Sequence, residues 1–296
     1  MSAEVRPGLV RALLAHGSVR AGGTVLLLIA LMGILAPWLT ALDPSYLDPT
    51  IRNRLPGAES TQFLPDGTMV TVTHWLGTDQ LGRDLFARVL YGARVSLVVG
   101  LTVAVIAVSL GLLIGLVAGY VRWLDGLFMR VMDGLMAIPP ILLALALVAL
   151  WGAGLVTVIL AVSIPEVPRV VRLVRSVVLS VREEPYVEAA ISVGTPTHLI
   201  LTRHIVPNTV APLIVQGTYV CASAILVEAI LSFLGVGIPT DIPTWGNIMA
   251  EGRLLFRVYP HNILFPGILL ALTVLAVNMM GDGMRDTLDP KLARRV

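Results

Sequence analysis

Charged residues are scarce in this sequence. Only 14% of its 296 residues are Asp, Glu, Lys or Arg, whereas 56% are hydrophobic. A soluble domain usually carries about 25% charged residues, so this chain has too little polar side-chain surface to cover a globule in water. The composition therefore excludes an ordinary soluble protein and indicates a chain that is largely embedded in a membrane.

Cysteine and lysine are nearly absent. Cys221 is the only cysteine, which excludes a disulfide framework and a thiolate metal cluster within the chain. All but one of the 21 basic residues are Arg. The exception, Lys291, follows Asp289-Pro290 and not the glycine-rich loop of a P-loop nucleotide site. The H-E-x-x-H and G-x-S-x-G motifs are also missing. We expect no catalytic residues, no metal ligands and no cofactor in this chain.

Long uncharged runs divide the chain. A helix needs about 20 apolar residues to cross the hydrocarbon core of a bilayer. The runs are 21–42, 95–121, 134–165, 204–227 and 258–281. The third run is too long for one helix and too short for two, and Trp151-Gly152-Ala153-Gly154 interrupts it. It is either one tilted helix or a tight hairpin whose ends extend into charged sequence around Arg130 and Glu166.

The distribution of arginine favours the hairpin. Basic residues gather before the first run and after the last, and the positive-inside rule then places both ends in the cytoplasm. An even number of crossings follows. We therefore predict an all-α polytopic membrane protein with six transmembrane helices and cytoplasmic N- and C-termini. Its segments are a cytoplasmic N-terminal segment 1–20, a first transmembrane helix 21–42, an external loop 43–93, a five-helix core 94–284 that contains a cytoplasmic loop 175–208 and an external loop 236–260, and a cytoplasmic tail 285–296.

The external loop 43–93 changes character at Thr78-Asp79. From there Leu81, Leu85 and Val89 recur at helical spacing, and charged residues lie opposite them. This pattern predicts an amphipathic helix that begins with a good N-cap and rests in the outer membrane interface.

Three polar residues within the apolar stretches are candidates for the translocation path, because intramembrane polar groups are functional by default. They are Glu228, Asn278 and Glu166. The alternative for each is a buried hydrogen bond between helices or a place at the membrane edge. Glu166 lies between Pro165 and Pro168, which each remove a helical hydrogen bond. Such backbone is tolerated only under cover of protein, so the fourth span is expected to face the protein interior.

The cytoplasmic loop 175–208 is not loop-like in composition. Pro185 and the residues after it predict a short helix, and Gly194 fits the C′ position that ends one. Thr195 can then cap a second helix with Pro196 in its first turn, and Pro207 would end that helix. The small side chains near the turn would let a partner's backbone approach closely. The alternative is a folded loop that merely caps the helix bundle.

This loop resembles the EAA loop of ABC importer permeases through the pattern Glu188-Ala189-Ala190-x₃-Gly194-x₁₀-Ile205-x-Pro207. Other segments, in order and at family-like spacing, resemble the C-type permease subunit of dipeptide and oligopeptide importers. They are Leu76-Gly77-Thr78-Asp79-Gln80-Leu81-Gly82-Arg83-Asp84, Tyr91-Gly92-Ala93-Arg94-Val95-Ser96-Leu97, Asp133-x₂-Met136-Ala137-Ile138-Pro139, Leu231-Ser232-Phe233-Leu234-Gly235, Pro243-x-Trp245-Gly246, and Asn278-x₂-Gly281-Asp282-x₂-Arg285-Asp286-x-Leu288-Asp289-Pro290. The chain departs from the family at Pro260-His261, where relatives often carry Pro-Trp.

The resemblance implies a type I ABC importer permease in a bacterial inner membrane, driven by ATPase subunits that bind ATP and Mg. It also implies a second homologous permease, two ATP-binding domains on one or two chains, an external peptide-binding protein and surrounding lipid as partners, and no nucleic acid. The implied substrate is a di- or oligopeptide. Nickel chelates, glutathione and oligosaccharides stay open, because relatives with those substrates share the motifs. The implied ATPase-coupling residues are Tyr186, Glu188, Ala189, Ala190, Gly194, Thr195, Pro196, His204 and Pro207.

Two other classes fit the sequence less well. An ion-coupled secondary transporter usually shows repeated halves with charged or broken helices at the midplane, and no such repeat is evident. A membrane-embedded enzyme needs a clustered catalytic set, which these residues do not provide.

Overall fold

The computed structural model describes residues 13–63 and 68–288. The predictions for residues 1–12 and 289–296, which include Lys291 and the terminal arginines, lie outside the described residues. The helices are α2 (Gly17–Ile34), α3 (Ala36–Leu39), α4 (Leu85–Tyr120), α5 (Arg122–Ala137), α6 (Pro140–Trp151), α7 (Leu155–Arg182), α8 (Pro185–Ser192), α9 (Thr197–Leu199), α10 (Val206–Phe233), α11 (Trp245–Gly252) and α12 (His261–Leu288). Two 3₁₀ turns, η1 (Pro49–Ile51) and η3 (Arg253–Leu255), a π-helical segment, η2 (Ile200–Ile205), and an antiparallel hairpin of β1 (Ala58–Phe63) with β2 (Met69–His74) complete the described fold.

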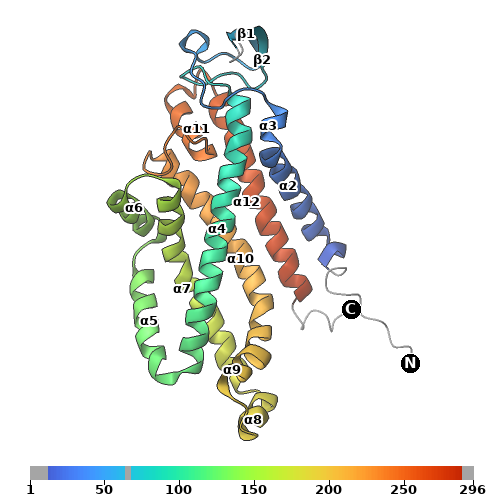
Figure 1. The fold of residues 1–296 in the computed structure, drawn as a ribbon, viewed down its shortest axis with the longest axis vertical. Helices are drawn as coiled ribbons and strands as arrows, with labels where there is room; N and C mark the ends of the chain where they lie inside the picture. The colour runs from blue at the N-terminus through green and yellow to red at the C-terminus, as the bar shows by residue number, and fades with distance from the viewer. Residues whose placement is uncertain (1–12, 64–67, 289–296) are drawn as a thin grey trace, which may run out of the picture.

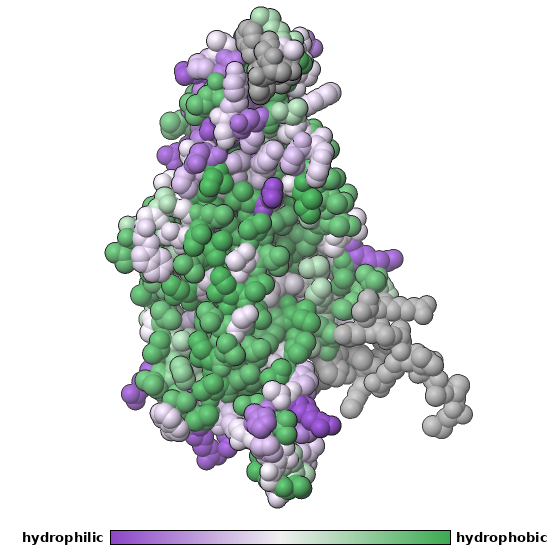
Figure 2. Space-filling model, viewed as in Figure 1, coloured by the Kyte–Doolittle hydropathy of each residue, from purple (hydrophilic) through white to green (hydrophobic). Residues whose placement is uncertain are grey.

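The long helices run side by side along one axis, with the β-hairpin at one end and α8 at the other (Figure 1). On the face seen in Figure 2, a broad hydrophobic belt covers the long helices, and hydrophilic residues gather at both ends. Within the described residues, four helices are long and apolar enough to span a membrane: α2, α4, the continuous stretch Thr197–Phe233 and α12. The pair α5 and α6 passes the same requirement as one bent span. The structure is thus a mostly helical, polytopic membrane protein.

Proline and glycine set the breaks around α6. Pro139 and Pro140 cannot continue α5, because proline lacks the N–H and disfavours helical backbone in the residue before it. The axes of α5 and α6 therefore meet at 89°. After Trp151, Gly152 adopts a φ of +89°, which ends α6, and α7 begins at Leu155. The interruption predicted at 151–154 is confirmed.

Helices α4 and α7 form the centre of the fold. Glycines recur every fourth residue along one face of α4, and a Cβ placed on any of them would collide with a valine of α7. Close approach of two helices through small residues is the usual way to pack them in a membrane, where van der Waals contact drives association. The facing pairs are Gly111 with Val170, Gly115 with Val174 and Gly119 with Val178.

Helix α7 continues through both of its prolines to Arg182. Pro165, Glu166 and Pro168 are all buried, so the freed backbone carbonyls lie inside the protein and not against lipid. The prediction that this span faces the interior is confirmed, and the prolines do not interrupt the helix.

The first helix is displaced from its predicted range of 21–42. Helix α2 already begins at Gly17 and ends at Ile34. Pro37 then occupies the first turn of the short helix α3, where its missing N–H costs nothing. Residues 40–42 are not helical.

The external loop differs most from its prediction. No helix begins at Thr78, whose hydroxyl instead accepts from the backbone N–H of Arg54 at 2.8 Å. The N-cap is Asp84, whose Oδ1 accepts from the N–H of Ala87 at 2.7 Å, and α4 then runs unbroken to Tyr120. Leu85 and Val89 are buried in the protein. The separate interfacial helix was therefore a wrong prediction, and the β-hairpin was not predicted.

Candidate functional site

Helix α8 projects from the end of the molecule opposite the hairpin (Figure 1). It ends as the sequence predicts: Gly194 has a φ of +81°, its N–H donates to the carbonyl of Ile191 at 2.9 Å, and the N–H of Thr195 donates to the carbonyl of Ala190 at 3.1 Å. These two bonds form a Schellman cap, which only a left-handed residue such as glycine allows without strain. Val187, fully buried, anchors the helix to the rest of the fold.

The second helix of this loop departs from its prediction. Thr195 does not cap it; Pro196 occupies the N-cap position, and no side chain provides a capping bond. Pro207 does not end it either, because α9, η2 and α10 form one continuous stretch from Thr197 to Phe233. A proline ring clashes with the carbonyl four residues earlier in an α-helix. The wider π-helical turn of η2 lies directly before Pro207 and accommodates that ring.

A set of polar and ring contacts ties α8 to the start of α10. The rings of Tyr186 and His204 lie 6.0 Å apart between centroids. The side-chain amide of Asn208 donates to the Tyr186 hydroxyl at 3.2 Å and to the His204 carbonyl at 2.6 Å. Sequence reasoning selected Tyr186 and His204 but missed Asn208, whose position directly after Pro207 was interpreted as a helix stop.

The tip of this loop exposes apolar side chains. Val193 is 86% exposed, and Tyr186, Ile191 and Leu199 are between 43% and 47% exposed. Glu188, Ala189 and Gly194 are also exposed, and Ala190 is half-buried. We call residues 185–199 the coupling loop. Apolar side chains clustered on a projecting tip mark a surface that a partner protein covers.

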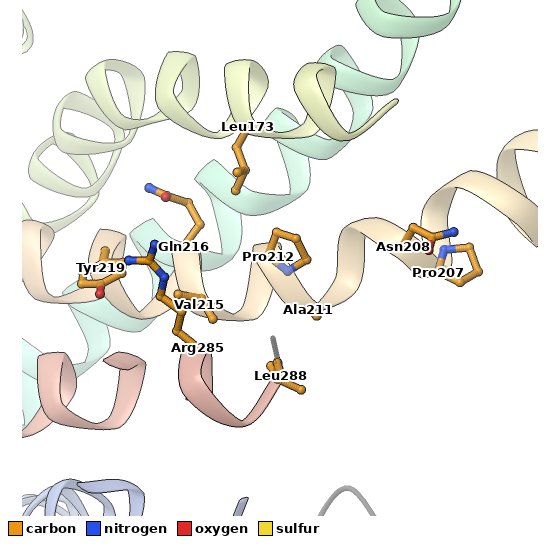
Figure 3. A pocket seen from close by; sticks show the side chains of 10 residues that line it. All are labelled: Leu173, Pro207, Asn208, Ala211, Pro212, Val215, Gln216, Tyr219, Arg285 and Leu288. Carbon is orange, nitrogen blue, oxygen red and sulfur yellow. The ribbon is translucent and has the colours of Figure 1, made fainter. Parts of the chain in front are cut away.

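A cavity of about 650 Å³ lies next to the coupling loop, between α7, α10 and α12. Its walls hold both apolar side chains and several that form hydrogen bonds (Figure 3). The lining residues are Leu173, Pro207, Asn208, Ala211, Pro212, Val215, Gln216, Tyr219, Arg285 and Leu288. Two of them, Pro207 and Asn208, lie in the first turn of α10. This helix is continuous with α9 of the coupling loop through η2, so the helix that carries the loop forms one wall of the cavity.

None of the three candidate path residues lines this cavity. Glu228 is fully buried near the far end of α10, where its Oε1 accepts from the Ser232 hydroxyl at 2.8 Å. Glu166 is 2% exposed and accepts from the Ser223 hydroxyl at 2.7 Å. Asn278 is half-buried on α12. The structure does not bring these three together, and it gives both carboxylates hydrogen bonds to hydroxyls.

The end of the molecule opposite the coupling loop holds an ion-pair network that sequence reasoning missed. The Nε of Arg83 lies 2.6 Å from Asp79, and Arg83 also pairs with Glu251 of α11. Fully buried Arg88 lies 3.2 Å from Glu251 and 3.6 Å from Asp79. The sequence carried one signal, the spacing of four or five residues between these charges, but the amphipathic-helix interpretation placed them on a solvated face.

Residues 107–294 match the family described as "Binding-protein-dependent transport system inner membrane component". The chain is 52% identical to the "Probable peptide ABC transporter permease protein y4tQ" of Sinorhizobium fredii, a match that covers 97% of this chain and 93% of the relative. It is 43% identical to the dipeptide transport system permease protein DppC of Alkalihalophilus pseudofirmus, over 88% of this chain and 82% of the relative. It is 40% identical to the glutathione transport system permease protein GsiD of Pectobacterium atrosepticum, over 95% and 89%.

The fold has a solved counterpart. An inward-facing structure of the MetNI methionine ABC transporter superposes with a TM-score of 0.56 at 16% identity, and the match covers 68% of this chain and 97% of that chain. At that identity the likeness supports the fold alone. The family match, however, includes α7, the coupling loop, α10 and α12 together. This chain therefore belongs to the inner membrane components of binding-protein-dependent transport systems, the multi-pass permease subunits of bacterial ABC importers, which work with ATPase and substrate-binding partners.

Proposed function

We propose that this chain forms half of the translocation path of a peptide importer and is driven through its coupling loop. The observation that carries this proposal is the continuity of the coupling loop with α10, a wall of the 650 Å³ cavity. The partners are a second homologous permease, two ATP-binding domains that bind ATP and Mg, and an external peptide-binding protein. Relatives named for peptides, dipeptides and glutathione support a peptide substrate.

Six crossings with both ends in the cytoplasm belong to the same proposal. The four long spans and the bent α5–α6 pair account for five. Helix α7 supplies the sixth, because it packs against α4, α6 and α10 and buries Glu166, the charged residue between its two prolines. In Figure 1 the start of α2 and the end of α12 point toward the end that carries α8. Arginines of α5, α7 and η2 cluster toward that end, as the positive-inside rule requires of a cytoplasmic face.

The coupling loop would transmit movement of the ATPase subunits to α10. An ATPase dimer that closes around ATP would push the apolar tip formed by Ile191 and Val193. The Schellman cap and the Tyr186–Asn208 hydrogen bond hold the tip rigidly to α10, so the push would reach the cavity wall and would not be lost in a flexible loop. This chain supplies the moving wall, and the partners supply the energy.

Val193→Asp in the reconstituted complex tests this proposal. A charge on the exposed tip should prevent desolvation against the ATPase subunits, so peptide-stimulated ATP hydrolysis should fall at least about tenfold. Val193→Ile keeps the apolar surface and should retain stimulation. The measurements are co-purification of the ATPase subunits and the rate of phosphate release with loaded binding protein. A Val193→Asp complex that assembles and hydrolyses ATP like the wild type would refute the coupling role. Peptide uptake by this chain without ATPase subunits would favour a secondary transporter instead.

A further inference from the structure

The cavity beside the coupling loop contains a guanidinium that has no carboxylate partner among the residues that the structure describes. Arg285 extends from the last turn of α12 toward α10, where Figure 3 shows it beside Tyr219. Among the described residues no Asp or Glu oxygen lies within ion-pairing distance of Arg285, although Asp282 is one turn away on the same helix. Three arginines of α7 are paired with carboxylates: Arg169 with Glu166, Arg172 with Asp133, and Arg175 with Asp125 at 2.5 and 2.7 Å.

Tyr219 explains why Arg285 is not paired with Asp282. The Tyr219 hydroxyl donates a hydrogen bond to Asp282 and so holds that carboxylate away from the guanidinium. The hydroxyl and the guanidinium of Arg285 interact as well. Gln216, one turn before Tyr219 on α10, adds an amide to the same wall. The guanidinium is therefore not paired with Asp282, and the Gln216 amide is a neutral donor on the same wall. An arginine fork matches the two oxygens of a carboxylate.

The opposite end of the cavity offers an acceptor. Pro212 lies within α10 and has no N–H, so the carbonyl of Asn208, four residues earlier, lacks its usual helical donor. Both residues line the cavity. The rise along α10 from Asn208 to Tyr219 is about 16 Å at about 1.5 Å per residue. An extended peptide of about four to five residues has that length.

We propose that Arg285, with Gln216, binds the C-terminal carboxylate of the transported peptide within the cavity, while Tyr219 holds Asp282 away from the guanidinium. This site deepens the proposed function and rests on it. Every unmodified linear peptide carries a free C-terminal carboxylate regardless of its side chains. A site for it on the moving wall would therefore accept varied sequences and still discriminate peptides from other amides.

The test compares trialanine with trialanine amide, which lacks the carboxylate. Proteoliposomes that contain the whole complex receive binding protein saturated with either peptide, and the initial ATP-dependent uptake rates give a preference ratio. A substitution in this chain cannot change the selectivity of the binding protein, so any change in the ratio arises in the permease. Arg285→Gln should lower the preference for the free acid about tenfold, the value of one charge-assisted hydrogen bond. Arg285→Lys should keep most of it.

Two further variants sharpen the result. Arg130→Gln removes an exposed arginine of α5 outside the cavity and should leave the ratio unchanged. Tyr219→Phe keeps every charge but frees Asp282 to pair with Arg285, so it should lower the ratio in the same direction. This variant also tests the site if Arg285→Gln fails to assemble.

Several results would overturn the site. Normal uptake by Arg285→Gln with an unchanged preference ratio would refute the carboxylate site and leave the proposed function intact. An unchanged ratio together with a lost dependence on anionic lipid would assign the guanidinium to a lipid phosphate and overturn the proposal as well. Absence of ATP-dependent uptake of either peptide by the wild-type complex would instead refute the proposed function itself.

Discussion

Replacing Gly115 with alanine tests whether the close packing of α4 on α7 stabilises the transmembrane core. A Cβ at this position would lie 2.6 Å from the Cβ and 2.9 Å from the Cγ1 of Val174, and 3.0 Å from the carbonyl oxygen of Val171. These atoms belong to or adjoin the backbone of α7, so no side-chain rotation can relieve the collision. The glycines one turn before and after meet α7 equally closely, so the helices cannot separate at one position alone.

The magnitude follows from two opposing terms. Overpacking a close-packed interior costs about 1–3 kcal/mol, whereas alanine is favoured over glycine in a helix interior by about 1 kcal/mol. Gly115→Ala should therefore destabilise the protein by about 0–2 kcal/mol. Gly126→Ala in α5 is the matched control, because a Cβ there meets nothing within 4 Å. It gains the same helix propensity without the collision. The difference between the two variants, about 1–3 kcal/mol, isolates the contact.

Thermal unfolding of the purified permease in mild detergent, followed by tryptophan fluorescence, measures this difference. Gly115→Ala should unfold several degrees below Gly126→Ala, because 1 kcal/mol shifts the midpoint of a domain of this size by about 2–4 °C. If Gly115→Ala were as stable as Gly126→Ala, the α4–α7 contact would not be close, and the packing argument would be wrong.

Three further predictions use the same preparations. Arg88→Met leaves Asp79 and Glu251 with one arginine instead of two and should cost about 3 kcal/mol in the unfolding assay, whereas Arg52→Met on the exposed surface should cost nothing measurable. Asp84→Ala removes the N-cap of α4 and should cost about 1 kcal/mol; stability equal to the wild type would show that another group caps the helix. Asn208→Leu removes the hydrogen bond from α10 to Tyr186 of α8, so ATPase subunits should still bind while peptide-stimulated hydrolysis falls, and full stimulation would argue against rigid coupling.

The sequence predicts features that depend on local backbone chemistry. The interruption at 151–154 follows from glycine, which can adopt the positive φ that Gly152 shows. The end of α8 at Gly194 follows for the same reason. The mostly helical, membrane-spanning class follows from composition, because no other spanning structure satisfies the backbone of such long apolar runs.

Rules based on residue type alone gave wrong helix boundaries at Thr78 and Pro207, because other parts of the structure altered the hydrogen bonding or the helix geometry there. Thr78 is a good N-cap by type, but the backbone of Arg54, 24 residues away, occupies its hydroxyl. Pro207 is a good helix stop by type, but the π-helical turn before it absorbs the clash. The first outcome depends on a residue outside any window of ten residues. The second depends on a π-helical turn next to the proline, which the rule for α-helices does not anticipate.

Side-chain pairs between distant elements could not be predicted from the sequence for a stronger reason. Arg83 meets Glu251 across 168 residues of sequence, and Tyr219 meets Asp282 across 63. Spacing along one helix can show that charges share a face, but it cannot show which other helix that face meets. The motif around Asp282 and Arg285 was recognised as a family pattern, and only the packing of α12 against α10 shows that it borders a cavity.

The π-helical segment η2 makes α9 and α10 one continuous helix, so it joins the coupling loop mechanically to the cavity. A proline stop at Pro207 would have made the coupling loop a separate module, joined to the membrane by flexible chain, and a push on its tip would have been lost. Because η2 accommodates the proline, the helix from Thr197 to Phe233 is one rod that extends from the coupling loop along the cavity wall to Glu228 and Ser232 near its far end. A displacement at Val193 must then alter the cavity, the α10–α12 contact, or both. The prolines of this rod, at 207 and 212, lie between the tip and Tyr219, so any bending should concentrate beside the very wall that faces Arg285.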